Sequence, residues 1–254
     1  MLVVDDEGSV RDFLRAFFQA RFAVTTVANA AEALRALLEG ERFDILVIDK
    51  NMPGMSGVEL IRQIREADDD VAIAMITGYA SAESIVETLN LGIDAYIEKP
   101  FKSLTEFGAL VDSILARRKK TPEAVREAAR EARVVGAIGD FDQRVEVAAA
   151  LATLPAKVTC VGTELELVDL LDPEPDIVLL DTVAWRGWTP KIVETIAERA
   201  PFAACVVLSS GNLSTDALKA LVDLGVVAVL MWHEDPDWQK KLLESARRVL
   251  APAG

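Results

Sequence analysis

Short apolar runs alternate with amphipathic stretches along the whole chain of 254 residues. Brief apolar runs between polar turns are typical of buried parallel strands, and apolar residues at three- and four-residue spacing are typical of covering helices. In the first half the predicted strands are Leu2–Val4, Ala23–Val27, Ile45–Ile48, Ala72–Ile76 and Ala95–Ile97. Helical patterns fill the gaps, at Ser9–Ala20, Ala30–Glu39, Ser56–Ala67, Ser81–Leu91 and Ser103–Arg117. This strict alternation predicts a three-layer α/β sandwich.

The second half repeats the plan. Its predicted strands are Val134–Ile138, Lys157–Val161, Ile177–Leu180, Ala204–Leu208 and Val226–Met231, and a last helix is expected near Asp237–Leu250. The letters repeat as well, because Phe43–Asp49 matches Pro175–Asp181 and Asn90–Ile93 matches Asp223–Val226. The chain is therefore predicted to be one domain duplicated in tandem.

A domain boundary is predicted near residue 120. The basic run at 117–120 suits the carboxyl end of a helix, where the helix dipole favours positive charge. Thr121, Pro122 and Glu123 follow with the residue types of a helix start. We expect a first domain over residues 1–119, a helical linker over 120–133 and a second domain over 134–254.

Composition narrows the classes of partner. The net charge is −14, and a surface this acidic repels phosphate backbones and anionic membranes, so direct nucleic-acid binding is not expected. No apolar run approaches the roughly 18 residues that a membrane-spanning helix needs. Asp5, Asp6 and Glu7 follow the opening residues too closely for a signal peptide. Cys160 and Cys205 provide neither a disulfide framework nor a zinc set, so we expect a cytoplasmic protein with no membrane segment.

Chemistry-bearing residues end the predicted strands of the first half. Asp5 and Asp6 follow the first strand, Asp49 the third, Thr77 the fourth and Lys99 the fifth. Ligands of open parallel sheets bind beyond these carboxyl ends, and three carboxylates meeting there need a cation, for which Mg²⁺ is suited. A lysine opposite them suits the binding of a transferred phosphoryl group, and a carboxylate can accept that group as a nucleophile.

These residues stand in four longer motifs, Leu2–Glu7, Val47–Gly57, Ile76–Gly78 and Tyr96–Phe101. In this order they resemble the receiver domain of two-component response regulators, over residues 1 to about 118. The resemblance implies a flavodoxin-like (βα)5 fold, a doubly wound parallel sheet with strand order 2-1-3-4-5. Because the chain repeats itself, two such domains are expected in tandem.

The resemblance also assigns the acceptor and the metal site. Asp49 would be the phospho-acceptor. Asp6, Asp49 and the backbone carbonyl of Asn51 would hold Mg²⁺, and Asp5 would act through water. A sensor histidine kinase or a phosphotransfer protein would be the donor.

Three further residues complete the assignment by resemblance. Lys99 would bind the phosphoryl group, Thr77 would be the switch hydroxyl, and Tyr96 would be the aromatic residue that turns inward when Thr77 moves. Such a domain catalyses only its own phosphorylation and slow dephosphorylation, so the chain is not expected to be an enzyme with a separate substrate.

The second domain is expected to be altered. Aligned on the letters, Asp181 takes the place of Asp49, Gly139-Asp140 that of the acid pair and Ser210 that of Thr77, while Trp232 replaces Lys99 and Val229 replaces Tyr96. Candidate remnants of a site are therefore Asp140, Asp181 and Ser210. We predict a degenerate receiver, similar to the pseudo-receiver domains of the family, that no longer takes phosphate.

The tryptophans of the second domain allow two interpretations. Trp185, Trp188 and Trp232 fall on the rim of the presumed site, and Trp238 lies near it. Exposed indoles recur as interface anchors, so this rim, or the neighbouring helix face, could contact a partner or the first domain. Equally, the indoles could pack over a collapsed pocket without metal.

Several functions remain open. The leading hypothesis is a regulator phosphorylated on Asp49 whose output is a downstream protein interaction, with a homodimer as one form of it. The alternative is the sensory fragment of a longer regulator, such as a receiver–receiver–cyclase chain, in which the second domain serves as a dimerisation adaptor. A hydrolase with Asp49 as nucleophile lacks a general base, since Asn51 and Tyr79 flank the site. FMN binding, which a flavodoxin-like fold would permit, is opposed by the acidic rim.

Overall fold

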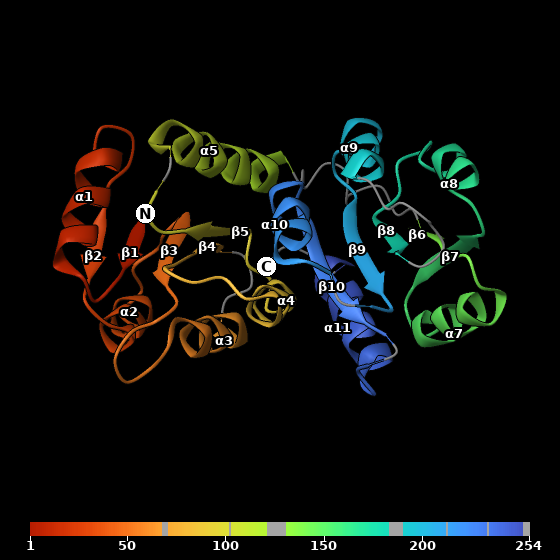
Figure 1. The fold of residues 1–254 in the computed structure, drawn as a ribbon, viewed down its shortest axis with the longest axis horizontal. Helices are drawn as coiled ribbons and strands as arrows, with labels where there is room; N and C mark the ends of the chain where they lie inside the picture. Colours follow the sequence, from red (N-terminus) through yellow and green to blue (C-terminus); the bar gives the residue numbers. More distant parts are fainter. Residues whose placement is uncertain are drawn as a thin grey trace. The chain divides into compact units, whose positions relative to one another are not determined.

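The computed structural model describes residues 1–67, 71–101, 103–120, 131–182, 190–211, 213–232 and 234–250. The chain divides into two compact units, Met1–Lys119 and Lys120–Gly254 (Figure 1). Each unit has its own five-stranded sheet. Within the described ranges, no helix is long and apolar enough to cross a membrane.

The first unit is a parallel sheet between two layers of helices. Its strands are β1 (Leu2–Val4), β2 (Thr25–Val27), β3 (Ile45–Asp49), β4 (Ala72–Thr77) and β5 (Ala95–Glu98), in the order β2-β1-β3-β4-β5. Its helices are α1 (Gly8–Phe18), α2 (Ala30–Leu38), α3 (Gly57–Ala67), α4 (Ala82–Asn90) and α5 (Leu104–Lys120). Helix α5 lies over one face of the sheet and helices α2 and α3 over the other (Figure 1). The predicted order 2-1-3-4-5 is confirmed.

The second unit has the same architecture. Its strands are β6 (Ala132–Ala137), β7 (Ala156–Val161), β8 (Ile177–Asp181), β9 (Ala204–Ser209) and β10 (Val226–Met231), in the order β7-β6-β8-β9-β10. Its helices are α7 (Phe141–Leu151), α8 (Glu164–Leu170), α9 (Pro190–Arg199), α10 (Thr215–Asp223) and α11 (Trp238–Leu250). Counted within the unit, the strand order is again 2-1-3-4-5, which confirms the tandem duplication of the fold.

The start of the second sheet differs from the prediction. Ala132 and Arg133 were assigned to the end of the linker, but they pair with Ala156 and Lys157 as the first residues of β6. An alanine next to an arginine is typical of a helix, and only pairing with β7 makes the segment a strand. The remainder of the predicted linker, residues 121–130, lies outside the described residues.

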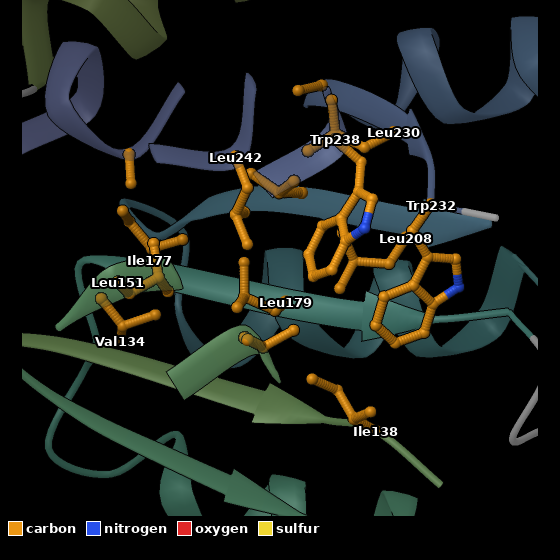
Figure 2. Packing of buried hydrophobic residues seen from close by; sticks show 14 of the residues in the cluster. Val134, Ile138, Leu151, Ile177, Leu179, Leu208, Leu230, Trp232, Trp238 and Leu242 are labelled. Atoms are coloured by element: carbon orange, nitrogen blue, oxygen red, sulfur yellow. The ribbon is translucent and has the colours of Figure 1, made fainter. Parts of the chain in front are cut away.

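The core of the second unit contains two of the four tryptophans. Trp232 and Trp238 are 3% and 7% exposed. Their rings meet edge to face with centroids 5.5 Å apart, among the apolar side chains of strands β6, β8, β9 and β10 (Figure 2). For these two residues the packing interpretation is correct and the exposed partner surface is not. Trp185 and Trp188 lie outside the described residues.

The two cysteines are separate thiols, of which Cys205 is buried and Cys160 is partly buried. Cys160 lies on β7 and Cys205 on β9, and strands β6 and β8 stand between them in the sheet. Burial raises the pKa of the Cys160 thiol to about 11 and that of Cys205 to about 12. Neither is therefore a reactive thiolate at neutral pH.

Candidate functional site

A lysine bridges two buried carboxylates at the carboxyl edge of the first sheet. Asp5 follows β1 and Asp49 ends β3, and their exposed fractions are 0% and 4%. The Nζ atom of Lys99, just beyond β5, lies 2.8 Å from Asp5 Oδ2 and 2.8 Å from Asp49 Oδ1. The sequence predicted that these three side chains converge, and the structure brings them together.

The second oxygen of each carboxylate is held by the backbone. The Asn51 N–H donates to Asp49 Oδ2 at 2.8 Å, and the Glu7 N–H donates to Asp5 Oδ1 at 2.9 Å. In each carboxylate, one oxygen thus contacts the ammonium of Lys99 and the other accepts a backbone N–H from the loop that follows its strand. This arrangement fixes the orientation of both side chains before any ligand binds.

A glycine allows helix α3 to begin close to Asp49. At Gly57 a Cβ atom would overlap the backbone carbonyl of Asp49, so the approach requires glycine. The Gly57 N–H also donates to the Lys50 carbonyl at 2.9 Å and closes the loop. The loop passes through Gly54, whose φ of +81° favours glycine as well. Both glycines of the motif after Asp49 therefore have a conformational reason.

Thr77 and Tyr96 lie on the neighbouring strands β4 and β5. The buried Thr77 hydroxyl donates to the Tyr79 carbonyl at 2.9 Å and receives the Tyr79 N–H at 3.2 Å. Tyr96 is 5% exposed, and its hydroxyl lies 3.1 Å from the Ser84 hydroxyl on α4. The aromatic ring predicted to turn inward is therefore already buried here, hydrogen-bonded to α4.

Burial and charge act against each other at this site. Burial raises the pKa of Asp49 above the ordinary aspartate value, and the hydrogen bond from Lys99 offsets only part of this rise. Burial lowers the pKa of Lys99, but hydrogen bonds to Asp49 and Asp5 outweigh burial and leave that pKa raised. Lys99 therefore carries its positive charge at neutral pH, where it offsets the charge of the two carboxylates.

The donor set fits Mg²⁺ by its chemistry. Asp5 and Asp49 present oxygen atoms only, with the exposed Asp6 next to them in the chain. Mg²⁺ needs only one or two protein carboxylates because it retains several waters. Within the described ranges, no three His, Cys, Asp or Glu side chains are gathered into a metal cluster. Asp5 and Asp49 thus share the ammonium of Lys99, and Asp6 lies at the surface. The roles of Asp6 and of the Asn51 carbonyl in holding Mg²⁺ stay predictions.

Strand register corrects the position of the second hydroxyl. Asp49 and Asp181 each end the third strand of their unit, and in both units the residue that follows their cross-strand partner bears a buried hydroxyl. In the first unit this residue is Thr77, and in the second it is Ser209. Each hydroxyl donates to the carbonyl two residues further on, at 2.9 Å and 2.8 Å. The prediction of Ser210 was therefore wrong by one residue.

Strand register also corrects the position of the acid pair. The residues that follow β1 and β6 in equivalent positions are Asp5 and Ile138, because each donates its N–H to the last residue of the neighbouring edge strand. Gly139 then takes the place of Asp6. Asp140 instead caps helix α7 by accepting the Gln143 N–H at 3.0 Å. Aligning the letters matched acid with acid, but neither Asp5 nor Asp6 has an acid at the equivalent position of the second unit.

The counterpart of the lysine is confirmed. The Lys99 N–H donates to the Thr77 carbonyl at 2.7 Å, and the Trp232 N–H donates to the Ser209 carbonyl at 3.1 Å. The indole of Trp232 and the side chain of Ile138 belong to one core cluster (Figure 2). An apolar pair thus stands where the first unit has an ion pair.

Asp181 alone repeats an acid of the first site. Its side chain is 1% exposed, and the Gly139 N–H donates to its Oδ2 at 3.4 Å. Beside it, the Thr182 and Ser209 hydroxyls are 3.1 Å apart. Of the three predicted remnants, Asp181 is therefore the one that lies in the equivalent place.

Residues 1–110 match the family model described as the response regulator receiver domain. The transcriptional regulatory protein PrrA of Mycobacterium tuberculosis is 34% identical over 216 residues, which cover 77% of this chain and 92% of that protein. The chain belongs to the response-regulator family. The hydrogenase transcriptional regulatory protein HoxA of Cupriavidus necator is 40% identical to this response regulator over 102 residues, 40% of this chain and 21% of that protein.

Solved receiver structures resemble parts of this response regulator. A CheY-like receiver domain protein from Methanospirillum hungatei JF-1 has a TM-score of 0.45 and 31% identity, covering 48% of this chain and 96% of that one. TrrA from Thermotoga maritima, solved in complex with Mg(2+)-BeF, has a TM-score of 0.41 and 32% identity, covering 44% of this chain and 96% of that one.

Proposed function

We propose that the first unit accepts a phosphoryl group on Asp49 from a histidine kinase or a phosphotransfer protein, in a reaction that requires Mg²⁺. The observation that carries this proposal is the contact of one Lys99 ammonium with both buried carboxylates, at 2.8 Å each. A bridging ammonium can exchange one carboxylate for phosphoryl oxygens without losing the other, and so can guide the group to Asp49.

The proposed transfer is an in-line displacement. A carboxylate oxygen of Asp49 forms a bond to phosphorus as the bond from phosphorus to the donor histidine nitrogen breaks. The nitrogen keeps the bonding electron pair, and the ring leaves as neutral imidazole when its other nitrogen carries the proton. Lys99 orients the phosphoryl oxygens and stabilises the charge that spreads over them.

Asp6, Asp49 and the Asn51 carbonyl, with Asp5 through water, would hold Mg²⁺. The ion would supply charge neutralisation at the phosphoryl oxygens. The buried Thr77 hydroxyl would then turn from the Tyr79 carbonyl toward a phosphoryl oxygen, and this change would bias the surface around α4.

The second unit is proposed not to accept phosphate. At the positions of Asp5, Asp6 and Lys99 it has Ile138, Gly139 and Trp232, which offer neither a carboxylate for the cation nor an ammonium for the phosphoryl group. Ile138 and Trp232, which stand at the positions of the ion pair, are both buried in the apolar core. Such apolar surroundings disfavour the charged group that transfer would bring.

The output is proposed to be a protein interaction. PrrA and HoxA are named as transcriptional regulators, so binding to DNA is the competing output. The net charge of −14 opposes binding to DNA. Both described units also have the sheet topology of a receiver domain. Salt-dependent retention of the protein on DNA would favour the competing output instead.

The test is intact-mass analysis after incubation with Mg²⁺ and acetyl phosphate, a small phosphodonor. We expect the wild type and Asp181→Asn to gain one phosphoryl group and Asp49→Asn to gain none, because only Asp49 has the lysine. Asp181→Asn is the matched control, since it makes the same change at the equivalent strand end. An equal gain by Asp49→Asn, or a loss of the gain in Asp181→Asn, would contradict the proposal.

A further inference from the structure

An arginine one turn into the first helix of each unit holds the loop that precedes it. In the first unit Arg11 Nη1 donates to the carbonyl of Asp5 at 2.7 Å and to that of Asp6 at 2.9 Å. In the second unit Arg144 Nη1 donates to the carbonyl of Ile138 at 2.9 Å and, more weakly, to the next carbonyl at 3.4 Å. The two arginines occupy equivalent positions and make the same pair of bonds.

Comparing the two units distinguishes a role of this arginine in the fold from a role in cation binding. A single domain would not allow that distinction. In the second unit the clamped residues are Ile138 and Gly139, which offer no side chain to a cation, so Arg144 can act only on the fold. In the first unit the clamped residues are Asp5 and Asp6, two of the three acids proposed to hold the cation. If replacing Arg11 weakens cation binding and replacing Arg144 does not, the loss is therefore due to the altered placement of Asp5 and Asp6.

We infer that Arg11 is a positioning residue that sets Asp5 and Asp6 for a divalent cation. This inference rests on the cation site of the proposed function. The Asp5 carboxylate is already held by the Glu7 N–H at 2.9 Å and by Lys99 at 2.8 Å, and Arg11 fixes the backbone from which it projects.

Asp6 depends more strongly on this clamp. Its side chain is exposed, and the bond from Arg11 to its carbonyl ties its backbone to the start of α1. Without that bond the turn would gain conformational freedom, and Asp6 would have to lose it again whenever a cation bound. Groups that orient metal ligands typically contribute about 10- to 100-fold to metal affinity.

The experiment is a calorimetric titration of the 254-residue chain with Mg²⁺ alone. Arg11→Met removes the donors but keeps an apolar stem, and Arg144→Met is its matched control. We expect Arg11→Met to weaken the Mg²⁺ Kd about 10- to 100-fold and Arg144→Met to leave it within error of the wild type, both in samples that are folded by circular dichroism. Phosphorylation of Arg11→Met should then be slow at low Mg²⁺ and recover at saturating Mg²⁺.

Three results would overturn the inference: an unchanged Kd in Arg11→Met, an equal weakening in Arg144→Met, or no binding of Mg²⁺ by the wild type. If the wild type binds Mg²⁺ but Asp49 gains no phosphoryl group, the proposed function fails while the titration still decides the role of Arg11. If Arg11→Met does not fold, Arg11→Gln, which retains one amide donor, replaces it in the same titration.

Discussion

The two units share their backbone contacts at the strand ends but differ in the side chains placed there. In both, the residue after the fifth strand donates its N–H to the last residue of the fourth, and an arginine clamps the loop after the first strand. After its first and fifth strands the first unit has Asp5 and Lys99, whereas the second unit has Ile138 and Trp232 at the equivalent positions. The backbone arrangement at the strand ends therefore does not depend on the side chains of the candidate site, because hydrogen bonds to backbone carbonyls hold it.

The ion pair of the first unit and the apolar pair of the second also differ in their expected contribution to stability. A buried ion pair must recover the cost of removing two charges from water, and replacing it by well-packed apolar groups is often neutral or stabilising by about 1–4 kcal/mol. The first unit retains charges that a fold alone would not need. The second unit has a buried indole and a buried aliphatic side chain at the equivalent positions, which suits a structural role.

Removing the lysine should have the largest effect. Lys99→Ala leaves the buried carboxylates of Asp5 and Asp49 without their shared cation, and breaking a buried pair costs about 3–5 kcal/mol. Phosphorylation should also slow by about 10²- to 10³-fold, the usual effect of losing one charge-stabilising donor. Urea unfolding and the initial rate of phosphorylation measure the two effects.

The equivalent change in the second unit should affect stability alone. Trp232→Ala removes a buried indole and should cost about 3–5 kcal/mol, with phosphorylation of Asp49 unchanged. A slowed phosphorylation in this variant would show that the two units are coupled and would contradict a purely structural role of Trp232.

Restoring the acid should be costly in the second unit. Ile138→Asp places a charge where the exposed fraction is 0%, and an unpaired buried charge costs about 3–5 kcal/mol. The double variant with Trp232→Lys should recover about 0.5–3 kcal/mol of coupling energy, because the first unit shows that an aspartate and a lysine meet at these positions. A double-mutant cycle by urea unfolding measures this coupling, and additive losses would contradict it.

The ionised carboxylate of Asp49 should reduce stability at neutral pH. Because the pKa of Asp49 is raised in the folded protein, the folded state binds this proton more tightly than the unfolded state does. The free energy of unfolding therefore falls as pH rises from the unfolded pKa, about 3.9, through the folded one. Asp49→Asn should then raise the Tm at pH 7.5, and the gain should shrink as pH approaches 4. A gain that grew on acidification would contradict this sign.

The smallest effect concerns the corrected hydroxyl. Ser209→Ala removes a buried group that donates to the Gly211 carbonyl and should cost about 1 kcal/mol. Ser210→Ala should cost less than about 0.5 kcal/mol, because a substitution away from buried contacts has little effect. Paired urea unfolding curves distinguish the two positions, and a larger loss at Ser210 would contradict the strand register.

Much of the fold and of the first site followed from the sequence. Alternation of apolar runs with amphipathic stretches predicted both sheets, because buried parallel strands and their covering helices impose different periods on the chain. Asp5, Asp49 and Lys99 were found together because the carboxyl ends of parallel strands meet at one edge.

Tertiary structure decided what a local pattern does not contain. Ala132 and Arg133 became strand by pairing with β7, and Trp232 proved to be core although its position in the chain placed it on the rim. The counterparts of Asp5 and Thr77 shifted by one residue, to Ile138 and Ser209. Side-chain letters align by likeness, whereas a strand aligns by hydrogen bonds to its neighbours, and only those bonds set which residue faces the site.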